Sequence, residues 1–200
     1  MRIGIDIDDT LLNIVNSMLK YADKYDIEVL GRKGSNGNIG LIKNRYYLKS
    51  LYNWTDEEKF NFFEMYYKNV LEECTLKENA DKVCQKFKED GNEIYFISAR
   101  LGNVKDCNTE QITKNTFEKN NIPYTKLIIN AKDKITISKE LNIDLFIEDS
   151  YETCSQLAEI GINSILITTP LNDKIDTGNI PRANNWDEIY EQYKKYYKNN

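Results

Sequence analysis

The first twelve residues, MRIGIDIDDTLL (residues 1–12), organise the rest of the chain. Their apolar run predicts a buried strand that leads into a loop. Three carboxylates fall at this junction, those of Asp6, Asp8 and Asp9. Carboxylates gathered at one strand end repel one another unless a cation lies among them. Because ligands bind at the carboxyl ends of strands in open α/β sheets, the stretch predicts a metal-assisted carboxylate site. The alternative is a solvated acidic turn after an edge strand.

Charge and composition narrow the chemistry that the chain can perform. It has 200 residues, enough for one α/β domain with an insertion, and its formal net charge is -5. Without a basic stripe, we expect neither a nucleic-acid polymer nor a membrane as a partner. The sequence has no histidine, which excludes Ser-His-Asp, Cys-His and histidine-based metal chemistry. Four cysteines without a CxxC pair, no signal segment and no long apolar run are typical of a reduced cytoplasmic protein.

The order of the predicted elements favours an α/β fold, with a doubly wound (Rossmann-like) parallel sheet. After the first strand, strands are predicted at 93–98, 126–130, 144–148 and 164–167. They alternate with helices at 108–120, 135–141, 151–160 and 186–197, which implies right-handed βαβ units. We therefore expect residues 1–13 and 92–200 to form the α/β core. Residues 14–91 are expected to form a helical cap inserted after the first strand.

The expected cap is built from helices. Apolar residues at helical spacing predict a helix over 11–25 and another over 76–90. Between them, Thr55 followed by Glu58 is a capping box that opens a further helix. The glycine-rich stretch 31–40 predicts a mobile loop, in which a phosphate-cradling role is left open because no GxGxxG pattern is present.

The cap is also rich in aromatic residues, and most of them are expected to form its core. Rings that face the acidic strand would form a wall for a flat ligand. Tyr46, Tyr47 and Trp54 lie in the less regular stretch before Thr55. We therefore expect rings of this stretch, Tyr47 and Trp54 above all, to contact the substrate rather than Phe62 or Phe63.

Further polar residues follow other strands of the expected core. Ser98 ends the second core strand, Lys134 follows the third, and Glu148 with Asp149 ends the fourth. Taken singly, each has an ordinary explanation as a turn residue, a solvated lysine or a helix cap. In a doubly wound sheet, however, all these strand ends meet at one edge beside Asp6. The ordered combination is therefore far more specific than any of its members.

The ordered set DIDDT, Ser98, Lys134 and Glu148–Asp149 resembles the four-motif signature of the haloacid dehalogenase-like hydrolase superfamily. The stretches IGIDIDDTLL, ISAR, IEDS and RANNWDEI resemble, more narrowly, its 5'(3')-deoxyribonucleotidase branch and the related bacterial nucleotidases. The resemblance covers residues 1–13 and 92–170. Two positions depart from the common pattern. Asp9 stands where many members carry Gly, and Glu148 stands where Asp is frequent, which leaves the role of Glu148 open.

The resemblance implies a Mg²⁺-dependent phosphomonoester hydrolase. In that reading, Asp6 attacks phosphorus and forms an aspartyl phosphate. Asp8 first protonates the leaving alcohol and then activates water. The metal ligands would be the carboxylates of Asp6 and Asp149 and the backbone carbonyl of Asp8.

The same resemblance implies how the phosphate is held. Ser98 and Lys134 would bind its oxygens, and Lys134 is preferred over Lys132. Asp9 and Arg100 are also placed at the phosphate, although a structural salt bridge is an equal alternative for Arg100. Thr10 is expected to fix the nucleophile loop.

The aromatic residues of the expected cap suggest which kind of substrate the protein binds. Its aromatic rings favour a base, so we expect a nucleoside monophosphate. A sugar phosphate or another small metabolite is the alternative. A dehalogenase would not need Asp8, and a slow phosphoacceptor module is disfavoured by the same acid. The base, the sugar, the 5' or 3' position and a homodimer are left open.

Overall fold

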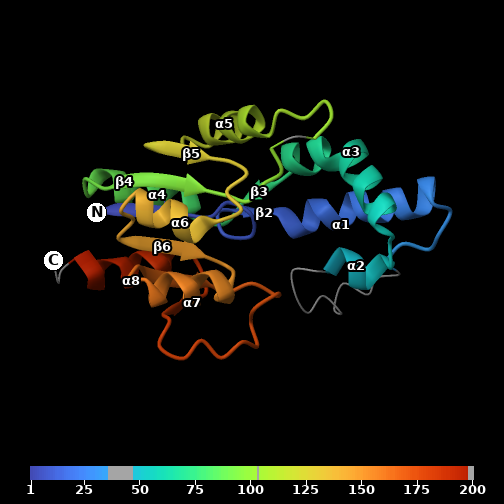
Figure 1. Cartoon of the computed structure of the whole chain (residues 1–200). Helices are drawn as coiled ribbons and strands as arrows, with labels where there is room; N and C mark the ends of the chain where they lie inside the picture. Colours follow the sequence, from blue (N-terminus) through green and yellow to red (C-terminus); the bar gives the residue numbers. More distant parts are fainter. Residues whose placement is uncertain (36–46, 103, 198–200) are drawn as a thin grey trace.

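The computed structural model describes residues 1–35, 47–102 and 104–197, and its centre is a six-stranded parallel sheet (Figure 1). The sheet order is β5-β4-β1-β6-β7-β8. In chain order, the strands are β1 (Arg2–Ile5), β4 (Glu93–Ile97), β5 (Lys126–Ile128), β6 (Leu145–Glu148), β7 (Asn163–Ile167) and β8 (Arg182–Ala183). Every pair in this sheet is parallel. The doubly wound parallel sheet that the sequence predicts is confirmed.

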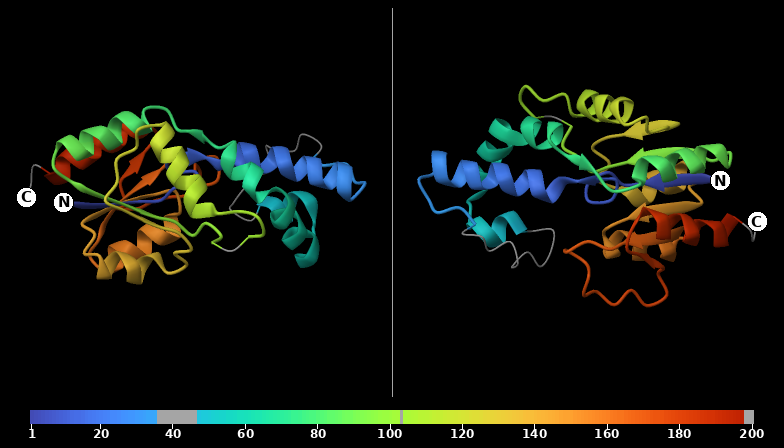
Figure 2. Two further views of the ribbon diagram at one scale, coloured as in Figure 1. Left: turned by 90° about the horizontal axis from the view of Figure 1, so that it is seen from above. Right: turned by 180° about the vertical axis from the view of Figure 1, so that it is seen from behind.

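Helices cover both faces of this sheet (Figure 2). One face carries α4 (Ala80–Glu89), α5 (Thr109–Lys119) and α8 (Trp186–Tyr197), and the other carries α6 (Lys134–Glu140) and α7 (Tyr151–Glu159). Alternation along the strands fills both cores, because successive side chains point to opposite faces. In β1, Ile3 and Ile5 pack toward α4 and α8, whereas Gly4 faces Phe146. A Cβ at Gly4 would lie 2.5 Å from the Phe146 ring, so only glycine fits there.

Two short antiparallel strands join the core to the cap. The chain leaves the core through β2 (Leu12–Asn13) and returns through β3 (Thr75–Leu76). The side-chain amide of Asn13 donates to Thr75 Oγ1 and to the Leu76 carbonyl, both at 3.3 Å. The outgoing and returning segments are therefore fastened to each other at this junction.

The cap consists of α1 (Ile14–Lys24), the π-helix η1 (Tyr25–Val29), α2 (Tyr47–Tyr52) and α3 (Asp56–Glu72). The capping box of Thr55 is present at the start of α3, as predicted. An aromatic cluster forms the centre of the cap, with Tyr25, Trp54 and Phe62 in mutual contact. The expected mobile loop at 31–40 is described only as far as Ser35, and Tyr46 also lies outside the described residues.

The third helix expected in the cap, α4, packs on the sheet instead. Its buried residues Val83, Cys84 and Phe87 belong to the cluster that contains Ile3 and Ile5. This packing favours a cap that ends near β3, whereas the boundary predicted from the sequence is residue 91. None of the described helices combines the length and the apolar character needed to cross a membrane.

Candidate active site

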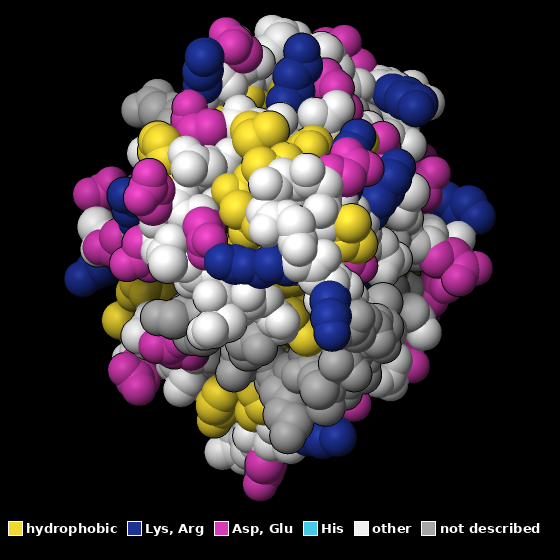
Figure 3. All heavy atoms as spheres, turned by 90° about the vertical axis from the view of Figure 1, so that its right-hand side faces the viewer, with side chains coloured by type: hydrophobic (Ala, Val, Ile, Leu, Met, Phe, Trp, Pro, Cys, Tyr) yellow, Lys and Arg dark blue, Asp and Glu magenta, His cyan; other side chains and the backbone are white. Residues whose placement is uncertain are grey.

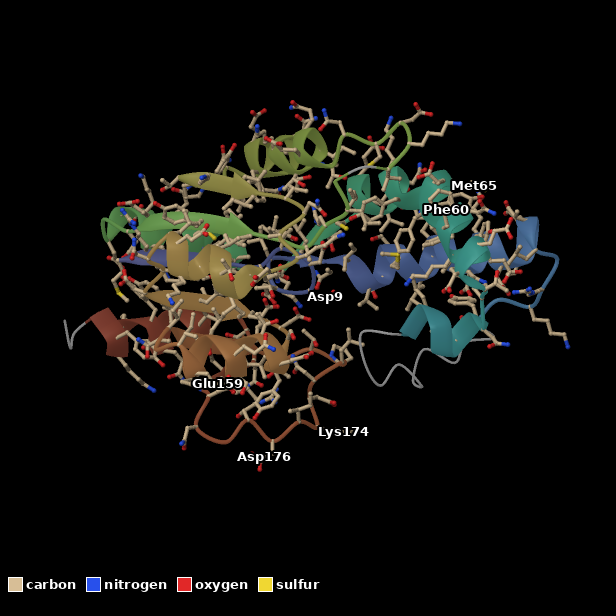
Figure 4. The ribbon with its side chains drawn as sticks, viewed as in Figure 1. Asp9, Phe60, Met65, Glu159, Lys174 and Asp176 are labelled. Carbon is tan, nitrogen blue, oxygen red and sulfur yellow. The ribbon has the colours of Figure 1, made fainter. Side chains whose placement is uncertain are left out.

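A pocket of about 1160 Å³ lies where the cap meets the carboxyl ends of the core strands. Its core side is lined by residues that follow β1, β4 and β6, including Asp6, Ser98 and Asp149. Its cap side is lined by residues of α1 and α3. Asp9 marks the junction between the two parts in Figure 4. The expected meeting of polar strand ends is therefore what the structure shows.

Lys134 lies between two buried carboxylates. Its ammonium group donates to Asp6 Oδ1 at 2.6 Å and to Glu148 Oε2 at 2.7 Å. Asp133 caps α6 by accepting a hydrogen bond from the backbone N–H of Thr136, which fixes Lys134 in the first turn of that helix. Lys132 is exposed. Of the two lysines considered from the sequence, the structure thus places Lys134 on Asp6.

Asp6, Glu148 and Asp149 form a compact acidic cluster. One carboxylate oxygen from each lies within 4.8 Å of the others. Burial raises the pKa of Asp6 to about 7, even though Lys134 acts in the opposite direction. Burial, followed by repulsion from Glu148 and Asp6, raises the pKa of Asp149 well above its usual value. Three carboxylates against one ammonium group leave a negative charge that a divalent cation would offset. This oxygen-only donor set suits Mg²⁺.

Glu148 is engaged by the protein itself, which bears on the role that the sequence left open. Besides Lys134, its carboxylate accepts hydrogen bonds from the backbone N–H groups of Asp149 and Ser150, at 3.1 and 3.2 Å. Its side chain therefore holds Lys134 and shapes the turn after β6. Lys134 contacts Glu148, so Asp149 is the residue of the pair that could serve as a metal ligand without giving up that contact.

Asp8 is held by a buried arginine. Arg100 Nε and Nη2 donate to Asp8 Oδ1 at 2.9 and 2.6 Å, and Arg100 Nη1 donates to Thr113 Oγ1 at 2.9 Å. The Arg100 side chain is fully buried. The guanidinium contacts of Arg100 are with Asp8 and Thr113, so the phosphate contact expected of Arg100 stays a prediction. The salt bridge considered as its alternative is what the structure contains.

Asp9 has a structural role that the sequence reading missed. Its backbone is left-handed, with φ 58°, a conformation that glycine adopts without strain. Its Oδ1 accepts hydrogen bonds from the backbone N–H groups of Ile14 and Val15, at 3.2 and 3.3 Å, at the start of α1. The contacts of this carboxylate are with the start of α1, and the phosphate contact expected of Asp9 stays a prediction. The Asp9 side chain fastens α1 to the loop that follows β1.

Thr10 and Ser98 complete the core side of the site. The buried Thr10 hydroxyl has no hydrogen-bond partner among the described residues, whereas its carbonyl accepts from Trp186 Nε1 at 3.1 Å. Thr10 thus fixes the loop through its backbone. Ser98 lines the pocket, and its hydroxyl accepts the backbone N–H of Arg100 at 3.3 Å.

The cap side of the pocket differs from the sequence prediction. Trp54 is only 5% exposed, stacks on Tyr52 and donates its indole N–H to the buried Asp26 at 2.8 Å. It belongs to the cap core and does not line the pocket, so that prediction is wrong. The side chain of Tyr47 lies outside the described residues.

One face of α3 provides the cap lining that the sequence reading overlooked. The pocket-facing residues of this helix are Asp56, Lys59, Phe60, Phe63 and Tyr67. Their spacing follows the i, i+3, i+4, i+7 pattern of a single helix face. That periodicity was present in the sequence, but it does not say which face packs inward. Phe62, between them in sequence, is fully buried in the cap.

A loop residue beyond the four motifs also supports the site. The Asn172 side-chain amide donates to the backbone carbonyls of Asp149 and Ile167, both at 2.8 Å. Arg182 Nη1 donates in turn to Asn172 Oδ1 at 2.9 Å. These bonds fix the backbone that carries Asp149. They connect the loop after β7 to the loop after β6, and no local sequence signal predicts such a link.

The chain is similar to curated bacterial proteins along most of its length. It is 33% identical over 147 residues to a nucleotidase of Clostridium acetobutylicum, covering 73% of each chain. It is 30% identical over 196 residues to the Bacillus subtilis protein named "Putative nucleotidase YqfW", covering 96% of this chain and 92% of that one. No protein-family model matches.

Solved structures share the fold at lower sequence identity. One is a haloacid dehalogenase-like family hydrolase from Streptococcus pneumoniae. Its TM-score is 0.67 and its identity 17%, and the match covers 96% of this chain and 97% of that one. At this identity the likeness shows the fold alone. It agrees with the parallel sheet and with the pocket at its carboxyl edge.

Proposed function

Since the chain belongs to a family of bacterial nucleotidases within the haloacid dehalogenase-like hydrolases, we propose that it hydrolyses phosphate monoesters through an aspartyl phosphate on Asp6. The observation that carries the proposal is the position of Lys134, whose ammonium group contacts the Asp6 carboxylate at 2.6 Å. A cation at that distance also suits the oxygens of a phosphoryl group bound at Asp6. Both groups line the pocket.

Two carboxylates share the chemistry. An Asp6 oxygen attacks phosphorus, the bond between phosphorus and the ester oxygen breaks, and Asp8 gives its proton to the departing alcohol. Asp8 then takes a proton from a water molecule that attacks phosphorus. The acyl phosphate bond breaks, and Asp6 and inorganic phosphate are released. Ser98 and Lys134 hold phosphate oxygens through both steps.

The acidic cluster fits Mg²⁺ as a cofactor. Asp6 and Asp149 would hold the ion together with the backbone carbonyl of Asp8, while Glu148 holds Lys134 in place. When bound, the ion supplies charge compensation between the carboxylates and the phosphate dianion. Burial of the cluster strengthens this requirement, because unpaired charges cost more free energy away from water.

For the substrate, we propose a nucleoside monophosphate. Phe60 and Phe63 line the cap side of the pocket, within the same cavity as Asp6. An aromatic ring stacks on a base, typically with about 1–3 kcal/mol per base. The nucleotidase names of the relatives support the same substrate class. A sugar phosphate remains the alternative, favoured by the polar Asp56 and Lys59 on the same wall.

The test is phosphate release from a panel of monophosphates, measured with Mg²⁺ and with EDTA. We expect turnover of nucleoside monophosphates that EDTA abolishes and Mg²⁺ restores. Faster turnover of sugar phosphates than of any nucleotide would overturn the substrate assignment. Undiminished turnover in EDTA would overturn the metal assignment, and no phosphate release from any monoester would overturn the proposed reaction.

A further inference from the structure

Arg100 fixes one oxygen of Asp8 and leaves the other available. Both guanidinium contacts, at 2.9 and 2.6 Å, are made to Oδ1. Among the described residues, none donates a hydrogen bond to Oδ2, and the Asp8 side chain is 26% exposed. A carboxylic acid held through one oxygen presents the other in a defined direction. Arg100 therefore determines where the proton of Asp8 can be delivered.

The position of Arg100 depends in turn on a short backbone segment, Arg100–Leu101, after β4. Thr109 Oγ1 donates to the Leu101 carbonyl at 2.6 Å. On the opposite side of the same peptide segment, the Leu101 N–H donates to Tyr67 Oη at 3.1 Å. Tyr67 is buried and belongs to α3, so the cap supplies this bond.

Other contacts join α3 to the same loop. The Lys105 N–H donates to Glu64 Oε1 at 3.3 Å, and Cys107 is buried in the apolar cluster of the cap. The loop after β4 is therefore packed against the cap, although it also carries Arg100. A displacement of α3 from this loop would break the bond between Tyr67 and Leu101 and release the segment that aims Arg100.

We propose that Arg100 and Tyr67 are positioning residues, through which the cap helix α3 holds Asp8 in its working orientation. The inference rests on the proposed function, because it concerns the acid that serves that reaction. Neither residue needs to touch the phosphate. Tyr67 acts on Asp8 through Leu101 and Arg100, so the acid is aligned only while α3 is seated on the loop.

The first test replaces Arg100 and varies the leaving group. In Arg100→Met, kcat/KM for a nucleoside 5'-monophosphate should fall about 100-fold, because its alkoxide leaving group needs the proton from Asp8. For p-nitrophenyl phosphate, kcat/KM should fall less than about fivefold, since p-nitrophenolate departs without protonation. Here kcat/KM reports steps up to phosphoenzyme formation. Arg100→Lys, which keeps the charge but lacks the planar fork, should show the same selectivity with a smaller loss.

The second test removes the link to the cap. Tyr67→Phe loses only the hydroxyl that accepts the Leu101 N–H, and we expect about a 3- to 10-fold loss of kcat with the nucleotide while KM stays within twofold. Tyr66→Phe is the matched control, because Tyr66 neighbours it on α3 but does not line the pocket. It should behave like the wild type.

The outcomes separate the inference from the proposed function. Wild-type turnover of both substrates supports the proposed function independently of any variant. Equal losses of kcat/KM for the two substrates in folded Arg100→Met or Arg100→Lys would overturn the positioning role and indicate phosphate binding or general distortion. If Tyr67→Phe matches Tyr66→Phe, the link to the cap is overturned. Thermal melting followed by circular dichroism establishes that each variant is folded. If Arg100→Met does not fold, the comparison of the two substrates in Arg100→Lys tests the positioning role.

Discussion

The two walls of the pocket present different chemistry. The core wall is charged and tightly interlocked, with Asp6 and Glu148 joined through Lys134. The cap wall is more apolar, with Ile14, Met18, Phe60 and Phe63, although the charged Asp56 and Lys59 also lie on it. Figure 3, which faces the end of the molecule that holds the cap, shows hydrophobic side chains gathered at its surface. Phe60 is 62% exposed.

This difference separates two tasks. Charged groups that hold one another in fixed positions through ion pairs suit one kind of ligand, such as a phosphoryl group with its cation. Apolar rings bind a flat surface with little directional demand, so their identity sets affinity more than chemistry. The core wall should therefore control the reaction, and the cap wall should control which ester is accepted.

Of the substitutions that test this division between the walls, one at Asp6 should have the largest effect on turnover. Asp6→Asn keeps the side chain nearly isosteric but removes the nucleophile, so turnover of every monoester should fall at least about 1000-fold. Phosphate release and the melting temperature are measured together. Asp144→Asn, at the opposite end of the central strands, is the matched control and should retain full activity. More than a few per cent of activity in folded Asp6→Asn would contradict the covalent mechanism.

The next largest effect is expected at the acidic cluster of the core wall, which is proposed to hold Mg²⁺. Asp149→Asn loses one charged ligand, so the Mg²⁺ concentration for half-maximal activity should rise about 10- to 100-fold. Titration of activity with Mg²⁺ measures this shift, with Asp144→Asn again as the control. Wild-type behaviour at low Mg²⁺ would show that Asp149 is not a ligand.

The two walls also differ in how far the sequence predicts them. Ser98, Lys134 and Asp149 could be placed together because each follows a strand, and parallel topology gathers strand ends at one edge. The partner of each charge was not predictable in the same way. For Arg100 the sequence left a phosphate contact and a structural salt bridge equally open, because a residue three positions after a strand end can turn to either side of the loop; the structure pairs it with Asp8.

The residues that line the cap wall could not be predicted from the sequence, for a different reason. Phe60, Phe62 and Phe63 all lie on α3 and are alike in chemistry, but only a helix packed in place shows which of them faces inward. Trp54 was chosen because its segment is irregular, whereas the indole found a buried partner in Asp26. Helical periodicity identifies a face, and tertiary packing decides what covers it.

The cap wall can be tested alone with Phe63. Phe63→Ala should raise KM for a nucleoside monophosphate about 10-fold and leave kcat nearly unchanged, because stacking acts equally in the ground and transition states. Hydrolysis of p-nitrophenyl phosphate should change much less. Met65→Ala is the control, since Met65 is exposed on α3 but does not line the pocket (Figure 4). Equal effects on the two substrates would mean that Phe63 is structural.

The smallest expected effect is on stability: the charged core wall should make the stability of the protein depend on pH. The pKa values of Asp6, Asp9 and Asp149 are raised, to about 7 for Asp6 and to about 6 for Asp9, mainly by burial. Without Mg²⁺, the folded protein therefore keeps protons that the unfolded chain loses above about pH 4. Stability should fall as the pH rises from about 4 to 7, because the folded state binds more protons throughout that window.

Mg²⁺ binds the ionised cluster of the folded state and should offset this loss. The increase in melting temperature on adding Mg²⁺ should therefore be a few degrees larger at pH 7.5 than at pH 5.0. Asp149→Asn removes one of the repelling carboxylates, so in EDTA it should melt higher than the wild type at pH 7.5 and close to it at pH 4. Phe63→Ala carries no charge change and should keep the wild-type pH dependence. A Mg²⁺ effect that is independent of pH would mean that the ion is not bound by these carboxylates.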